Sequence, residues 1–123
     1  MILVDTTVWV DHLRSRDDVL ARLLEAGSVL THPFVIGEIA LGNLAQRRIV
    51  LNALSGLPSA KVATDAEVSE FVERQTLFGR GVGWVDVHLL AAARLTAGSR
   101  FWTRDKRLRE IAARLNVDFV SSH

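Results

Sequence analysis

The sequence predicts an α/β fold with a parallel sheet and helices on both of its faces. Short apolar runs alternate with helical patterns along the 123 residues, and this alternation is typical of parallel strands joined by helices. No internal repeat, low-complexity tract or linker interrupts the pattern. We therefore expect a single domain over residues 1–123, because domains commonly run about 100–200 residues.

Five short apolar segments are the expected strands. They are Ile2–Val4, Ser28–Thr31, Ala60–Ala63, Arg100–Thr103 and Val117–Val120. The third is the weakest of the five because it is short and contains Lys61. If it forms, it belongs at an edge of the sheet.

Helical segments fill the intervals, and two of them carry clear start signals. Pro33 precedes the segment Phe34–Leu44, and proline is favoured at the first helical position. Thr64 and Glu67 form a capping-box pattern at the start of Asp65–Phe78. The remaining helices are expected at Thr7–Arg14, Asp17–Ala26, Ile49–Leu54, Val85–Ala97 and Asp105–Leu115.

The composition narrows the class of protein. Hydrophobic residues make up 49% of the chain, an excess that favours a homodimer or another protein partner. The net charge of +1 gives no general sign of nucleic-acid binding, and the lack of cysteine excludes disulfides and thiolate metal sites. No segment reaches the roughly 20 apolar residues of a membrane span, and the N-terminus lacks a signal-peptide pattern. We expect a cytoplasmic protein with no membrane partner.

Two acids stand where predicted strands end. Asp5 directly follows Ile2–Val4, and Asp105 lies just after Arg100–Thr103. Because the carboxyl ends of parallel strands form the ligand-binding edge of an open sheet, both acids are candidates for a site there. Taken singly, each is equally well explained as the N-cap of the following helix.

Two more acids, Glu38 and Asp86, are predicted on apolar helix faces. Neither has a basic residue three or four positions away, where helical neighbours lie, whereas Glu70 can pair with Arg74. We expect Glu38 and Asp86 to point toward the core side, with a buried salt bridge to a distant arginine as the alternative. The ordinary surface acids of this chain include Glu67, Glu70 and Glu73.

Together the four carboxylates predict a site for a divalent cation. Crowded carboxylates repel one another and are pushed toward their neutral forms unless a cation holds them ionised. Oxygen ligands without cysteine or clustered histidine favour Mg²⁺ or Mn²⁺ over zinc. Such a site supports phosphodiester hydrolysis. The hydroxyls of Thr6, Thr7 and Thr103 could bind the acids or the phosphate, although an ordinary capping role explains Thr6 at least as well. The histidines, which we interpret as structural or surface residues, are His12, His32, His88 and His123.

Basic residues near these acids are candidates for a groove that binds a nucleic-acid backbone. A run of basic residues on a helix is, however, usually just a solvated face, which is the simpler explanation. They are Arg80, Arg104, Lys106, Arg107 and Arg109.

Three stretches carry a resemblance to a known family. They are MILVDTTVWVDHL, FVIGEIALG and GWVDVHLLAAARLTAGSRFWTRDKRL, which together reach from the first strand to the last helix. With its acids in the order Asp, Glu, Asp, Asp, the chain resembles the PIN-domain ribonucleases and, among them, the VapC-type toxins of bacterial toxin–antitoxin pairs.

The resemblance implies an α/β/α sandwich with a parallel sheet of about five strands and an endoribonuclease that depends on Mg²⁺ or Mn²⁺. It also implies a homodimer that is inhibited by a small VapB-type antitoxin, whose tail covers the active site. Several family members carry a further acid near the last one, whereas Lys106 and Arg107 flank Asp105 here. The number of metals therefore stays open. The implied metal ligands are Asp5, Glu38, Asp86 and Asp105, with Thr7 and Thr103 as the hydroxyls beside them.

Two other function classes remain to be weighed. A phosphohydrolase of the haloacid-dehalogenase type needs a second aspartate where Thr7 stands, and a receiver domain needs one at the end of the third strand, near Ala63. A non-catalytic interaction module with the same fold is the other alternative. Loss of one acid would be its signature, and none is lost.

Overall fold

The computed structural model describes residues 1–120, and its centre is a parallel sheet of three short strands. Strand β1 (Ile2–Val4) lies between β2 (Val29–Leu30) and β3 (Arg100–Trp102). Within this sheet Ile2 pairs with Val29 on one side and with Arg100 on the other. The expected α/β fold with a parallel sheet is confirmed.

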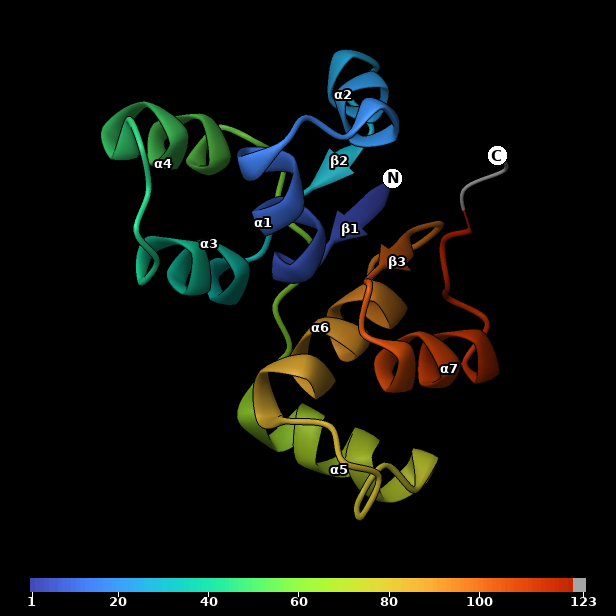
Figure 1. The fold of residues 1–123 in the computed structure, drawn as a ribbon. Helices are drawn as coiled ribbons and strands as arrows, with labels where there is room; N and C mark the ends of the chain where they lie inside the picture. The colour runs from blue at the N-terminus through green and yellow to red at the C-terminus, as the bar shows by residue number, and fades with distance from the viewer. Residues whose placement is uncertain (121–123) are drawn as a thin grey trace.

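Helices surround the sheet (Figure 1). Helices α1 to α4 gather on one side of β1, α5 and α6 lie together on the opposite side, and α7 lies beside β3. No helix in the stretch from residue 1 to 120 is both long and apolar enough to cross a membrane. The helices are α1 (Thr6–Arg14), α2 (Asp18–Glu25), α3 (Pro33–Ala40), α4 (Arg47–Ser55), α5 (Asp65–Gln75), α6 (Trp84–Leu95) and α7 (Lys106–Arg114).

The expectation of about five strands is wrong, because two of the predicted strands are reduced to single bridges. Ser59 forms one parallel bridge to Thr31, and Asp118 forms another to Phe101. The predicted strand Ala60–Ala63 fails because the amide of Lys61 donates to a threonine side chain, Thr96 Oγ1, at 2.9 Å. That donor is therefore not available to a strand ladder. The two bridges mark where outer strands would lie without extending the sheet.

The helices with clear start signals begin where the sequence predicted, but α3 ends earlier than predicted. Both halves of the capping box at Thr64 and Glu67 are formed, and Pro33 is the first residue of α3. Helix α3 nevertheless ends at Ala40 rather than Leu44, because the Gly42 amide donates to a carbonyl only three residues back. Such a tightened turn is a common way for a helix to end.

Part of the core lies between the sheet and α6, which is buried almost all round, and the rest includes residues of α1 to α4. Every residue from Val87 to Ala93 is buried, as expected of a helix that is apolar on all sides. The alanines in this run have small side chains that let the helix approach its neighbours closely. Leu89 is fully buried, and the core also includes Leu3 and Val4 of β1. Packing of α6 therefore fixes the start of that helix, where Asp86 lies, relative to the sheet.

Truncating Leu89 tests this core. Leu89→Ala should lower the free energy of unfolding by about 2–5 kcal/mol, because it removes buried methyl groups and leaves a cavity. Leu41→Ala is the matched control, since Leu41 is 90% exposed and should change stability little. Denaturant unfolding followed by circular dichroism measures both, and equal effects would contradict the assigned core.

Candidate active site

Asp5 lies at the carboxyl end of β1 with only 4% of its surface exposed. It occupies the N-cap position of α1, but its side chain accepts no capping hydrogen bond from the helix. Its Oδ2 atom instead accepts hydrogen bonds from Thr7 Oγ1 at 2.8 Å and Thr103 Oγ1 at 2.7 Å. Helix capping therefore does not explain this acid, and the two predicted hydroxyls contact it directly.

Thr103 connects the ends of the two neighbouring strands. While it donates to Asp5, its Oγ1 accepts from the amide of Asp105 at 3.1 Å. Asp105 in turn caps α7, since its Oδ1 accepts from the Leu108 amide at 3.1 Å. For Asp105 the capping role is real, and it leaves the second carboxylate oxygen exposed near Asp5.

Asp86 is half-buried in the first turn of α6, and its Oδ2 accepts from the Gly83 amide at 3.1 Å. Burial raises the pKa of Asp86, and the negative charges of Asp5, Asp105 and Glu38 raise it further. Three acids act on the fourth, so all four carboxylates lie within one shared electrostatic field. The four predicted positions therefore come together in space.

Glu38 differs from its prediction in one respect, because its side chain is exposed rather than turned to the core. Its Oε1 accepts from Thr6 Oγ1 at 2.7 Å, which ties α3 to α1. Apolar neighbours misled the prediction: Leu41, three residues on, is itself 90% exposed. On a short helix with apolar residues on several sides, such neighbours do not mark the buried side.

No basic side chain neutralises these four acids in the described part of the chain. The nearby Arg104 is held by Asp11 at 2.8 Å and Asp17 at 2.7 Å, and none of the four acids forms a salt bridge. The alternative of a buried pair with a distant arginine is therefore wrong for Glu38 and Asp86 within residues 1–120. The uncompensated repulsion is the condition that a cation would relieve.

The donor set suits a hard cation, although no closed cage is formed. It consists only of carboxylate and hydroxyl oxygens, which Mg²⁺ and Mn²⁺ prefer. Across residues 1–120, however, no three acidic or histidine side chains are placed to enclose an ion. Each acid is instead turned to a local hydroxyl or amide. Binding an ion would require these side chains to converge by rotamer changes.

The histidines within the described residues play structural parts, in agreement with the sequence interpretation. His32 caps α3 by accepting from a backbone amide through Nδ1, and burial together with the charge of His88 lowers its pKa to about 4. His88 is buried beside Asp65, with 3.2 Å between Nε2 and Oδ1. His12 accepts from a backbone amide between α1 and α2. His123 lies outside the described residues.

Of two further contributors to the site, one was a candidate from the sequence and one was not. Thr6 was a candidate hydroxyl beside the acids, and it holds Glu38, whereas the backbone amide of Gly83 holds Asp86. The sequence did not show which acid Thr6 contacts, since its partner is 32 positions away. Gly83 acts through its main chain, which residue type alone does not reveal.

Comparison with known sequences places this arrangement in a family. Residues 2–114 match the PIN domain. The chain belongs to the PIN domain family. It is 48% identical over 117 residues to "Ribonuclease VapC32" of Mycobacterium tuberculosis strain CDC 1551 / Oshkosh, covering 95% of this chain and 94% of that protein. The protein of the same name in strain ATCC 25618 / H37Rv matches equally well. The resemblance that the motifs indicated is confirmed.

The shared field of this PIN domain's acids predicts an unusual effect of Asp86→Asn. A raised pKa means that the folded state binds the proton more tightly, so the free energy of unfolding falls as pH rises between the unfolded and folded pKa values. Asparagine at position 86 does not ionise, so this loss of stability with rising pH disappears. Its side-chain oxygen can still accept from the Gly83 amide. In EDTA at pH 7 the variant should melt at a higher temperature than the wild type, and the difference should shrink on acidification.

Glu67→Gln is the matched control, because the pKa of Glu67 is lowered whereas that of Asp86 is raised. The Thr64 amide that donates to its carboxylate lowers the pKa of Glu67. Its stabilising effect is present above the unfolded pKa and lost as pH falls through the folded one, so the substitution should lower the melting temperature at pH 7. Destabilisation by Asp86→Asn in EDTA would contradict the shared field.

Proposed function

We propose that this PIN domain is a metal-dependent endoribonuclease and the toxin of a toxin–antitoxin pair. The four acids Asp5, Glu38, Asp86 and Asp105 would be its metal ligands and catalytic residues. Membership of the PIN family and the 48% identity to a protein named as a ribonuclease support the activity. The observation that carries the assignment of the site is the buried Asp5 carboxylate at the end of β1, which accepts from Thr7 and from Thr103 beside Asp105.

Mg²⁺ is the proposed cofactor, with Mn²⁺ as an equivalent. A divalent cation, when bound, lowers the pKa of water and offsets the charge that develops on the phosphate. Asp5 and Asp86 would hold the ion from the buried side, and Glu38 and Asp105 from the exposed side, as their burial indicates. An RNA strand would approach from the exposed side, because only there can a phosphate reach the acids.

Thr7 and Thr103 are proposed to orient Asp5. Their hydroxyls donate to the same carboxylate oxygen, Oδ2, and leave Oδ1 for a ligand. The Arg104 amide donates to Thr7 Oγ1 at 3.1 Å and so directs the lone hydroxyl proton of Thr7 toward Asp5. The backbone therefore fixes the hydroxyl before any ligand binds. Such supporting hydrogen bonds orient ligands and tune a metal site.

The proposed partners follow from the VapC-type resemblance. They are an RNA substrate, a VapB-type antitoxin and a second copy of this chain, all met in the cytoplasm. Exposed apolar side chains support at least one protein interface: Leu41 is 90% and Ile49 is 65% exposed. Solvent exposure of such side chains is typical of surfaces that a partner covers.

A non-catalytic interaction module with the PIN fold is the second candidate. One observation favours it: in the described residues no three acidic or histidine side chains enclose an ion. The two candidates differ in whether the purified chain binds Mn²⁺ and cleaves RNA. The receiver or phosphohydrolase alternative lacks such support, because the chain belongs to the PIN family.

Asp5→Asn tests the nuclease directly. The purified wild-type chain should cleave single-stranded RNA when Mg²⁺ or Mn²⁺ is added and not in EDTA. Asp5→Asn should abolish cleavage, because it removes a ligand charge at the buried end of the site while keeping the shape of the side chain. Product lengths on a denaturing gel measure this.

Glu70→Gln is the control for that experiment. Glu70 is an exposed acid that pairs with Arg74 on α5 and is not one of the four site acids, so its loss should leave cleavage unchanged. Circular dichroism must show that Asp5→Asn is folded. Persistent cleavage by a homogeneous Asp5→Asn preparation would refute the assignment.

Thr103→Val tests the positioning role of the hydroxyl. The substitution keeps the β-branched shape and removes the donor to Asp5, so Mn²⁺ affinity should fall by about 10–100-fold. Thr31→Val is the matched control, because Thr31 is also a buried threonine after a strand and its Oγ1 has no partner within residues 1–120. Calorimetric titration of Mn²⁺ measures both. Equal affinities for the two variants would exclude the proposed role.

A further inference from the structure

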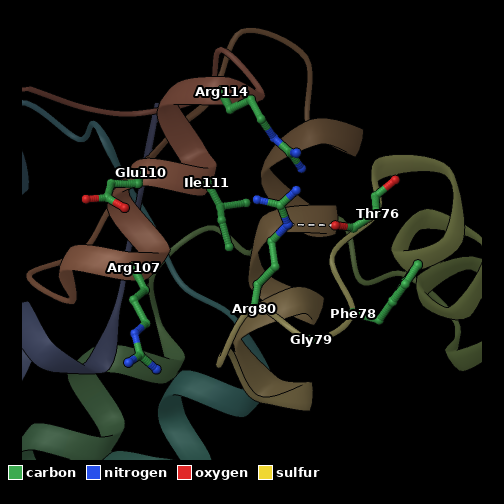
Figure 2. A pocket seen from close by; sticks show the side chains of 8 residues that line it. All are labelled: Thr76, Phe78, Gly79, Arg80, Arg107, Glu110, Ile111 and Arg114. Carbon is green, nitrogen blue, oxygen red and sulfur yellow. Dashed lines mark hydrogen bonds between the residues drawn. The ribbon is translucent and has the colours of Figure 1, made fainter.

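A basic hollow lies between the α5–α6 loop and one face of α7. It has a volume of about 690 Å³. Figure 2 shows the guanidinium groups of Arg80 and Arg114 turned toward the same space, whereas Glu110 points away from it. We call this feature the arginine hollow. Its lining residues are Thr76, Phe78, Gly79, Arg80, Arg107, Glu110, Ile111 and Arg114.

Two of its arginines are held in place by backbone carbonyls. Arg80 Nε donates to the Thr76 carbonyl at 2.8 Å (Figure 2), and Arg114 Nη2 donates to the Gln75 carbonyl at 2.6 Å. Each guanidinium group keeps further N–H groups that these bonds do not use. The arginines are therefore ordered before a ligand binds, which lowers the entropy cost of binding an anion.

The third arginine, Arg107, shapes the loop opposite it. Gly81 has a φ of +77°, and a Cβ atom at this position would collide with Arg107 Nη1. The loop thus passes close to the guanidinium group at a point where only glycine fits without strain. This close approach places Arg107 at the edge of the arginine hollow, where α7 begins.

The charge of the arginine hollow is not neutralised. Its lining holds three guanidinium groups and a single carboxylate, that of Glu110, which points away from the hollow, and within residues 1–120 none of these arginines forms a salt bridge. By contrast, Arg104 is held by two aspartates on the other side of the site. Uncompensated, ordered guanidinium groups are typical of phosphate-binding sites.

Each of the two walls of the arginine hollow leads along the chain to one of the site acids. Helix α7 begins immediately after Asp105, so Arg107 lies about 3 Å further along the helix axis. The other wall is the loop that leads through Gly83 into the first turn of α6, where Asp86 lies. A polyanion bound at the acids would therefore pass the arginine hollow at its next contacts.

We propose that the arginine hollow binds a backbone phosphate of the RNA strand beyond the bond that is cleaved, with Arg80 and Arg114 as its principal ligands and Arg107 on the side toward the acids. This inference rests on the proposed ribonuclease function and adds to it the contact that positions the substrate. The contact is to the backbone, so it strengthens binding without selecting a sequence.

RNA binding at several salt concentrations tests the proposal. The Asp5→Asn chain is used so that a fluorescent single-stranded RNA is not cleaved, and its anisotropy gives the affinity. Binding to single strands weakens with salt with a log–log slope of about −0.7 per phosphate contact. Adding Arg80→Ala and Arg114→Ala together should therefore flatten the slope by about 0.7, the loss of one phosphate contact. Arg80→Lys and Arg114→Lys together should largely keep the slope, because they keep both charges.

Arg22→Ala is the matched control. Arg22 is exposed on α2, outside the arginine hollow, and its loss removes one positive charge, as each of the two substitutions in the hollow does. The slope should remain at its original value. In the active chain, Arg114→Ala should raise KM several-fold and leave kcat nearly unchanged, since a contact away from the reacting bond contributes equally to ground state and transition state.

The outcomes separate this inference from the proposed function. RNA cleavage with an unchanged salt slope in the double variant would overturn the arginine hollow and leave the ribonuclease intact. Absence of RNA cleavage by the wild-type chain would overturn both. If the double variant binds RNA normally but loses affinity for an acidic peptide, the arginine hollow binds protein and the proposal is wrong.

Discussion

The buried carboxylate of Asp5 is the constraint on which the site depends. A charged group with 4% exposure is costly unless its hydrogen-bonding capacity is met. Thr7 and Thr103 meet it, and each belongs to a different segment, so the bonds also join the start of α1 to the end of β3. The hydrogen bonds that satisfy the buried carboxylate therefore also align two strand ends. Because Thr103 accepts from the Asp105 amide, they bring Asp105 beside Asp5.

The rest of the site is arranged around that fixed point by elements of differing burial. Helix α6 is buried from Val87 to Ala93 and presents Asp86 at its half-buried first turn. Glu38 and Asp105 are exposed, and each is held by one hydrogen bond. Thr6 Oγ1 donates to Glu38, and the Leu108 amide donates to Asp105. The buried acids form a rigid base, and the exposed ones can adjust to a ligand. Such an arrangement can hold mutually repelling carboxylates apart until a cation draws them together.

The sequence predicted features that depend on neighbouring residues and did not predict features that depend on long-range contacts. The strand ends before Asp5 and Asp105 and the capping box at Thr64 are local patterns, and they were predicted correctly. The exposure of Glu38 depends on what packs against α3, and the loss of the predicted strand Ala60–Ala63 depends on a hydrogen bond from the Lys61 amide to a side chain 35 positions away. Periodicity carries no information about such long-range contacts. For the same reason the sequence did not show that Thr6, a candidate hydroxyl, contacts Glu38.

The central claim is that the four acids form one cation site. Anomalous diffraction from crystals soaked in Mn²⁺ tests it most directly, because manganese scatters anomalously and carboxylate oxygens do not. The account predicts one or two strong peaks at about 2.0–2.3 Å from carboxylate oxygens of Asp5, Asp86 and Asp105, with Glu38 turned toward them. Strong peaks elsewhere, or none at saturating Mn²⁺, would contradict it.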